Sequence, residues 1–194
     1  MIAIPRLLGL ALLIAAPLAA SATSVTEAGA SFPTRMEAGD QELVLAGTGV
    51  SKYRVIFTVC AVGLYVPEGT PKDEILAADT PRHLEIEYFY DIPPEDIVRA
   101  SMHVLREQLS DDELARQREA LDRWHDAYQK VTDGDRYGMT YLPSDGTSLS
   151  LNGERLVSVP GAEFARTYFG IWLKPNDPLS KDLRRNLVKD LAAN

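Results

Sequence analysis

The chain has 194 residues, 45% of them hydrophobic, and its 28 acidic against 20 basic side chains give a formal net charge of −8. An acidic chain without a basic run is poorly suited to bind nucleic acids, because contacts to phosphates need Lys and Arg. Its single cysteine, Cys60, excludes an internal disulfide, so stability has to come from a hydrophobic core, for which the chain is long enough.

The first 22 residues have the pattern of a secretory signal peptide. Arg6 precedes a short apolar run over residues 7–18, and Ala20-Ser21-Ala22 has the small-x-small form of a cleavage site. The apolar run is short for a membrane-spanning helix, which needs about 20 residues. We therefore expect export, to the periplasm, and no membrane span after cleavage. Residues 23–194 are expected to form a single domain.

The first part of the mature chain is expected to contain a loose segment and then strands. Residues 23–39 are polar and rich in small side chains, which predicts a loosely held lead-in. A short strand over residues 42–46 is expected to end at Gly47-Thr48-Gly49. Residues 53–66 are typical of one long buried strand, or of two strands joined by a bend at Gly63.

The middle of the chain changes from strand to helix. A short helix is predicted over residues 72–78, and residues 82–90 alternate apolar and polar side chains, as in a strand with one buried face. Pro93-Pro94-Glu95-Asp96 is typical of a helix start. Ser110 and Glu113 form a capping box at the start of the next helix.

The last part predicts a meander of three strands followed by two helices. The strands are expected over residues 137–142, 147–151 and 155–159, with Asn152-Gly153 as the hairpin turn. One helix is expected to begin at Pro160, and another at Asp177-Pro178. Strands and helices that are segregated in this way favour an α+β fold, in which helices cover one face of a large antiparallel sheet.

Few residues have a pattern that points to chemistry. His83, His103 and His125 lack the spacing of metal ligands and no cysteine cluster accompanies them, so we expect no metal and no cofactor. His103 and His125 have polar neighbours in the helical segments and are expected at the surface.

An apolar cavity between the helices and the sheet is the remaining candidate site. Lys52 and Arg54 lie at the start of the long strand, and Cys60 and Tyr65 lie within it. A cation there would hold a carboxylate or an enolate-like oxygen. The alternative is that Lys52 and Arg54 are edge charges that discourage aggregation, and that Cys60 is a small buried apolar residue.

The sequence resembles the exported bacterial members of the chalcone isomerase-like family. The resemblance covers about residues 43–187, and it rests on segments whose order and spacing match: Leu45-Ala-Gly-Thr-Gly-Val50, Ala61-Val-Gly-Leu-Tyr65, Tyr88-Phe-Tyr-Asp-Ile-Pro-Pro-Glu95 and residues 137–173. It implies an open-faced β-sandwich, with a large antiparallel sheet and a helical layer on one face that encloses a cleft.

The resemblance also implies where the family's chemistry would lie. In catalytic members an Arg after a Gly-x-Gly-x segment stabilises an oxyanion, and a Thr in the next strand and a Tyr near a helix start help to position the substrate. Related members without the reaction bind fatty acids through the same Arg and a strand Tyr. In this chain the Arg position falls on Ser51 or Lys52, the strand position on Cys60 and the helical Tyr position near Ile97.

None of the three catalytic residue types is therefore kept. The resemblance implies a protein without chalcone isomerase activity that binds a fatty-acid-like or other small apolar ligand, with Ser51, Lys52, Arg54, Cys60 and Tyr65 as candidate contacts. The first alternative is an intramolecular lyase that uses Lys52 or Arg54 as its oxyanion cation. The second is a structural or partner protein of the cell envelope, which would expose an apolar patch.

Overall fold

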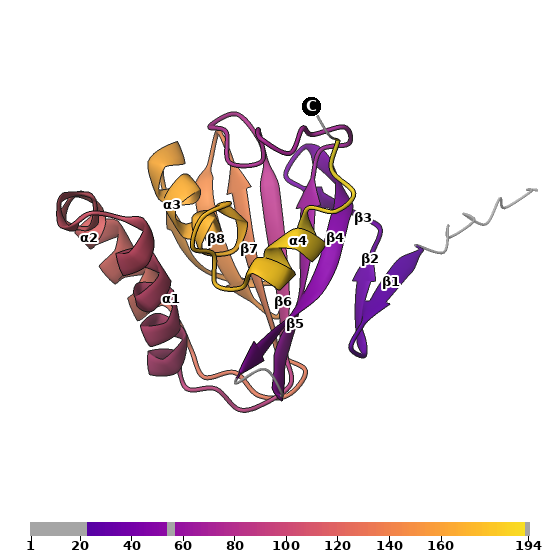
Figure 1. Ribbon diagram of the computed structural model, residues 1–194, viewed down its shortest axis with the longest axis horizontal. Helices are drawn as coiled ribbons and strands as arrows, with labels where there is room; N and C mark the ends of the chain where they lie inside the picture. Colours follow the sequence, from indigo (N-terminus) through magenta and orange to yellow (C-terminus); the bar gives the residue numbers. More distant parts are fainter. Residues whose placement is uncertain (1–22, 54–56, 193–194) are drawn as a thin grey trace, which may run out of the picture.

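The computed structural model describes residues 23–53 and 57–192 of the chain (Figure 1). The predicted signal peptide, residues 1–22, and the candidate Arg54 lie outside the described residues. The strands are β1 (Ser24–Glu27), β2 (Ala30–Pro33), β3 (Arg35–Ala38), β4 (Gln41–Tyr53), β5 (Phe57–Val66), β6 (Arg82–Tyr88), β7 (Arg136–Leu142), β8 (Gly146–Leu151) and β9 (Glu154–Val159). The helices are α1 (Pro94–Gln108), α2 (Asp111–Asp126), α3 (Ala162–Leu173) and α4 (Lys181–Leu187).

A seven-stranded antiparallel sheet forms the centre of the fold, in the order β3-β4-β5-β6-β7-β8-β9. Each strand pairs with its neighbour in the sequence. The helices lie on one side of the sheet and the β1-β2 hairpin lies on the other (Figure 1). The predicted α+β fold, with a large antiparallel sheet and a helical layer, is confirmed.

The side chains of β5 show how the two faces are divided. Val62 and Leu64 pack into the main core beneath the helices. Ala61 and Tyr65 point the other way, into a smaller core that includes Phe32 of the hairpin. Because successive side chains of a strand alternate between faces, one strand contributes to both cores.

Local signals in the sequence located several elements correctly. Asn152 and Gly153 turn between β8 and β9 with positive φ angles of 51° and 84°, as the tight hairpin turn requires. The Ser110 side chain accepts a hydrogen bond from the Glu113 backbone N–H, and the Glu113 carboxylate accepts one from the Ser110 N–H, so the predicted capping box at α2 is confirmed. α1 begins at Pro94, also as predicted.

The expectation that Gly47-Thr48-Gly49 ends a strand is wrong, since β4 runs through it from Gln41 to Tyr53. The two glycines are needed because α4 crosses the strand there. A Cβ on Gly47 would lie 2.2 Å from the backbone oxygen of Asn186, and one on Gly49 would lie 2.9 Å from Leu183 Cδ1. The Gly-x-Gly segment therefore serves close packing between helix and sheet.

The loose lead-in expected over residues 23–39 is also wrong. These residues form β1, β2 and β3, and the first two make a hairpin that covers the sheet face without helices. The hairpin buries Phe32 completely. This burial orders a segment whose polar composition alone gives little reason to fold.

The short helix predicted over residues 72–78 is replaced by turns. Arg82, which is fully buried, explains how this connection is held. Its Nη1 donates to the backbone oxygens of Ile75, Ala77 and Thr80 at 3.3, 3.0 and 3.0 Å. A side chain from the next strand thus supplies the hydrogen bonds that a helix would have made internally.

Two further expectations differ from the structure. The last helix begins at Lys181 instead of Asp177, because Ser180 caps it by accepting from the Leu183 N–H at 3.2 Å. The polar face of β6 is not exposed as expected, since His83 is only 5% exposed and lies against the ring of Tyr65.

Candidate ligand-binding cavity

A cavity of about 750 Å³ lies between the sheet and the helical layer. Its walls come from β4, β5 and β6 on the sheet side and from α1 and the end of α3 on the helix side. Its volume falls within the range of about 300–1,000 Å³ that small-molecule sites occupy in proteins.

A bulge in β5 shapes the sheet side of the cavity. Ser51 pairs with Cys60 and Lys52 pairs with Thr58, so Val59 is an extra residue with no partner on β4. An extra residue reverses the alternation of faces beyond it. Phe57 and Val59 therefore line the same cavity as Cys60, although a regular strand would have turned them to the opposite face.

The inner wall of the cavity is buried and uncharged among the described residues. Its residues, each 9% exposed or less, are Cys60, Ile86, Tyr88, Ile97, Ser101, Ile171 and Trp172. Burial raises the pKa of the Cys60 thiol to about 12, although hydrogen bonds from Ser51 oppose the shift. Burial also raises the pKa of Tyr88 well above its ordinary value, with Cys60 adding to the shift. Both groups are therefore protonated and neutral at physiological pH.

The charged residues of the cavity lie at its mouth. Lys52 and Asp91 are exposed, Arg99 is 71% exposed along its side chain and Asp96 is 45% exposed. Arg99 is ion-paired with Asp96, one helical turn away on α1. Asp91 accepts from Lys130 Nζ at 2.6 Å. The cavity is thus apolar inside and polar only where it opens to water.

The structure places three of the candidate contacts from the sequence in the cavity and one outside it. Ser51, Lys52 and Cys60 line the cavity, and Ser51 and Cys60 lie directly opposite each other on paired strands. Tyr65 does not line it. It lies on the other face of the sheet, 1% exposed beneath the hairpin. Tyr65 is five positions after Cys60 on the same strand, and an odd offset places two side chains on opposite faces.

Several cavity residues were not singled out from the sequence, above all Ile86 and Tyr88 of β6, Trp172 of α3 and His103 of α1. A signal was present for the first two, since the alternation over residues 82–90 puts them on one buried face. His103 is exposed as expected, whereas His125 is partly buried and stacks on Tyr128 with ring centroids 6.4 Å apart.

The described residues hold no group of three or more His, Cys, Asp or Glu side chains arranged for a metal ion. Over residues 23–53 and 57–192, no helix has both the length and the apolar character needed to cross a membrane. A cavity of this size with an apolar inner wall has room for a small apolar molecule.

The sequence matches the family described as chalcone isomerase-like over residues 24–188. The chain belongs to the chalcone isomerase-like family. The solved structures include the fatty-acid binding protein AtFAP1 of Arabidopsis thaliana, to which this chain is similar with a TM-score of 0.68 and 18% identity, over 87% of this chain and 97% of that one. No match is found among curated proteins. At this identity the similarity to AtFAP1 shows a shared fold.

In this chalcone isomerase-like chain, the positions that correspond by resemblance to the family's catalytic residues lie close together. Ser51 and Lys52, Cys60 and Ile97 all line the same cavity. The positions that the resemblance assigned to the family's site therefore surround one cavity. Ser51, Cys60 and Ile97 place a hydroxyl, a neutral thiol and an aliphatic side chain there, and Lys52 is at the mouth.

Proposed function

We propose that this protein binds a fatty-acid-like or other small apolar ligand in the cavity between the sheet and α1, and that it is exported. The observation that carries the proposal is the cavity of about 750 Å³ with a buried, uncharged wall and charges only at its mouth. Removing an acyl chain from water is favourable by roughly 0.8 kcal/mol for each buried CH₂ group. The fatty-acid binding of AtFAP1, which has the same fold, supports the same choice of ligand.

The distribution of charge also suggests how such a ligand would lie. The inner wall offers no charged partner for a carboxylate among the described residues, and burying an unpaired carboxylate is costly. Lys52 and Arg99 are at the mouth. The acyl chain would therefore point inward and the carboxylate would remain at the mouth, near these two cations.

A binding measurement with matched variants tests the proposal. We expect a fluorescent fatty acid to bind the mature protein at micromolar concentration and to be displaced by dodecanoate. Ala100→Trp, at the exposed edge of the cavity on α1, should obstruct its opening and weaken binding several-fold, whereas Ala115→Trp on the exposed side of α2 should not. An empty protein in native mass spectrometry, together with no acyl binding at micromolar concentration, would refute the proposal.

The orientation has a separate test. Lys52→Ala and Arg99→Ala should weaken the binding of dodecanoate several-fold while they leave dodecanol binding unchanged, since only the acid has a charge to pair. Equal losses for acid and alcohol, or no loss for either, would mean that the carboxylate does not lie at the mouth.

Isomerase activity is not part of the proposal. Stabilising an oxyanion needs a donor or cation in a dry site, and Lys52 is exposed to water. We expect chalcones to cyclise in the presence of the protein at the spontaneous rate. The loss of enone absorbance measures this rate. A faster rate that disappears in Lys52→Ala or Arg54→Ala would instead establish the intramolecular lyase.

Export rests on the first 22 residues, with their apolar run and the Ala20-Ser21-Ala22 pattern. Expression of the full chain in a Gram-negative bacterium should give a periplasmic protein whose mass corresponds to cleavage after Ala22. Retention of the whole chain in the cytoplasmic fraction would contradict this.

A further inference from the structure

Three of the four large exposed apolar side chains in the described part of the chain lie at the cavity mouth. Among the described residues, the large hydrophobic side chains with high exposure are Val25, Phe57, Tyr90 and Leu179. The last three line the cavity, and they are 54%, 54% and 37% exposed. They come from three separate segments: the start of β5, the connection from β6 to α1 and the connection from α3 to α4. The fold thus brings isolated apolar residues to one opening.

We propose that this opening docks on the surface of a zwitterionic phospholipid bilayer, so that Phe57, Tyr90 and Leu179 enter the interface and the ligand passes between bilayer and cavity without crossing bulk water. The inference rests on the proposed function in one respect, since it takes the ligand to be apolar. Docking at the mouth gives these three side chains an apolar environment, and it places the inner wall next to the source of acyl chains.

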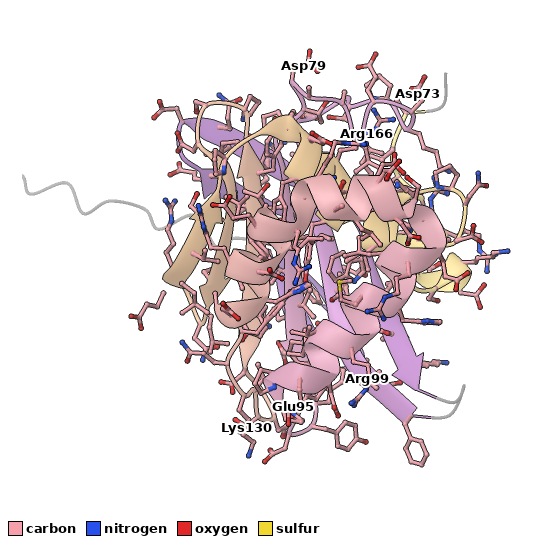
Figure 2. The ribbon with its side chains drawn as sticks, turned by 90° about the vertical axis from the view of Figure 1, so that its left-hand side faces the viewer. Asp73, Asp79, Glu95, Arg99, Lys130 and Arg166 are labelled. Atoms are coloured by element: carbon pink, nitrogen blue, oxygen red, sulfur yellow. The ribbon has the colours of Figure 1, made fainter. Side chains whose placement is uncertain are left out.

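The charges near the mouth fit a zwitterionic surface. Figure 2 shows Glu95, Arg99 and Lys130 together at one end of the molecule. Among the described residues that line the cavity, Lys52 and Arg99 are positive and Asp91 and Asp96 are negative, so these charges balance although the whole chain has a formal charge of −8. The excess negative charge therefore lies elsewhere on the protein. A balanced patch is not repelled by phosphocholine headgroups, which have no net charge.

The size of the apolar patch favours a bilayer over a second protein. An aromatic side chain buries about 150–250 Å² when fully covered, so each half-exposed ring offers on the order of 100 Å². The three side chains together offer far less than the roughly 800 Å² that each partner buries in a stable protein complex. A membrane interface, in contrast, accepts individual Tyr and other aromatic side chains at the headgroup level.

Flotation with phosphatidylcholine vesicles tests the inference, with the mature protein and two variants. The triple variant Phe57→Ser/Tyr90→Ser/Leu179→Ser should lose vesicle binding at least tenfold. Val25→Ser removes the fourth large exposed apolar side chain of the described residues, which is in the hairpin away from the mouth, and this variant should bind as the wild type does. All substituted positions are exposed, so thermal unfolding should confirm that the variants fold.

The same proteins are compared for dodecanoate affinity without vesicles and for the rate at which a fluorescent fatty acid leaves the vesicles. Docking predicts that the rate constant for loss of the fatty acid from the vesicles rises in proportion to the concentration of wild-type protein, and that the triple variant loses this dependence. Because the three substituted residues also line the cavity, the two proteins are compared at concentrations that bind the same fraction of fatty acid in solution. Wild-type protein that binds the fatty acid but no vesicles would overturn docking and leave the proposed function standing. Vesicle binding without fatty-acid affinity would overturn the proposed function and the transfer role together. A concentration-dependent dimer that the triple substitution dissociates would show that a second copy covers the mouth, which also overturns docking.

Discussion

Replacing Gly47 by Ala should destabilise the protein by closing the space in which α4 crosses β4. The new Cβ would lie 2.2 Å from the backbone oxygen of Asn186 and 2.7 Å from that of Leu187. Real Cβ contacts are almost never below 3.0 Å, so the helix backbone would have to retreat by about 0.8 Å (3.0 − 2.2). A flexible side chain could rotate away, but the end of a packed helix cannot.

The expected cost is about 3 kcal/mol, the upper part of the range measured for overpacked cores. For a domain of this size, each kcal/mol lowers the melting temperature by roughly 2–4 °C, so Gly47→Ala should melt about 6–12 °C below the wild type. Circular dichroism during heating and in urea gives both quantities. The affinity for dodecanoate, measured well below the melting temperature, should be unchanged, because Gly47 does not line the cavity.

Gly170→Ala is the matched control. Its Cβ would lie 3.2 Å from Lys174 Cε and 3.3 Å from Gln108 Oε1, which are wider separations and involve side chains instead of backbone, although Gln108 Nε2 donates to the backbone oxygens of Gly170 and Asp177. Removing a glycine from the middle of α3 also favours the helix by up to about 1 kcal/mol. This variant should therefore be as stable as the wild type or more so.

A melting temperature for Gly47→Ala within 2 °C of the wild type would refute the close-packing argument. A loss of ligand affinity without a loss of stability would make the Gly-x-Gly segment part of the binding site.

Three further predictions concern Cys60, Arg82 and Arg136. Because burial raises the pKa of Cys60 to about 12 from an ordinary 9.0, labelling of its thiol at pH 7.5 should be about 1,000-fold slower than labelling of an exposed cysteine. The labelling rate should rise with pH while the protein stays folded and should fall when dodecanoate is bound, and rapid labelling at pH 7.5 would contradict the burial. Arg82→Met leaves three backbone oxygens without their donor and should lower the free energy of unfolding in urea by about 3 kcal/mol, and a loss below 1 kcal/mol would show that water replaces the guanidinium. Arg136→Met removes the donor to the Ser31 backbone oxygen at 3.0 Å and the cation above the Phe32 ring. Amide hydrogens of β1 and β2 should therefore exchange with solvent at least tenfold faster. Unchanged exchange would show that Arg136 does not hold the hairpin on the sheet.

The meander from β7 to β9 and the starts of α1 and α2 were readable from the sequence because their causes are local. Asn152-Gly153 tolerates the positive φ angles of a tight hairpin, and the Ser110 and Glu113 side chains satisfy the backbone groups at a helix start. The opposite faces of Cys60 and Tyr65 were also readable, since an odd spacing along a strand separates side chains. Grouping these two residues in one site overlooked that alternation.

The arrangement of the cavity was decided by the tertiary structure. No local pattern shows that Val59 is an extra residue in the pairing of β4 with β5, because a bulge is a property of two strands in register. Gly47-Thr48-Gly49 has the composition of a strand break, and only the crossing of α4 gives its glycines another role. The sequence by itself thus determined the meander, the starts of α1 and α2 and the family of the fold. Which residues share the cavity, and which apolar side chains surround its mouth, was decided by contacts between distant segments, which depend on packing in three dimensions.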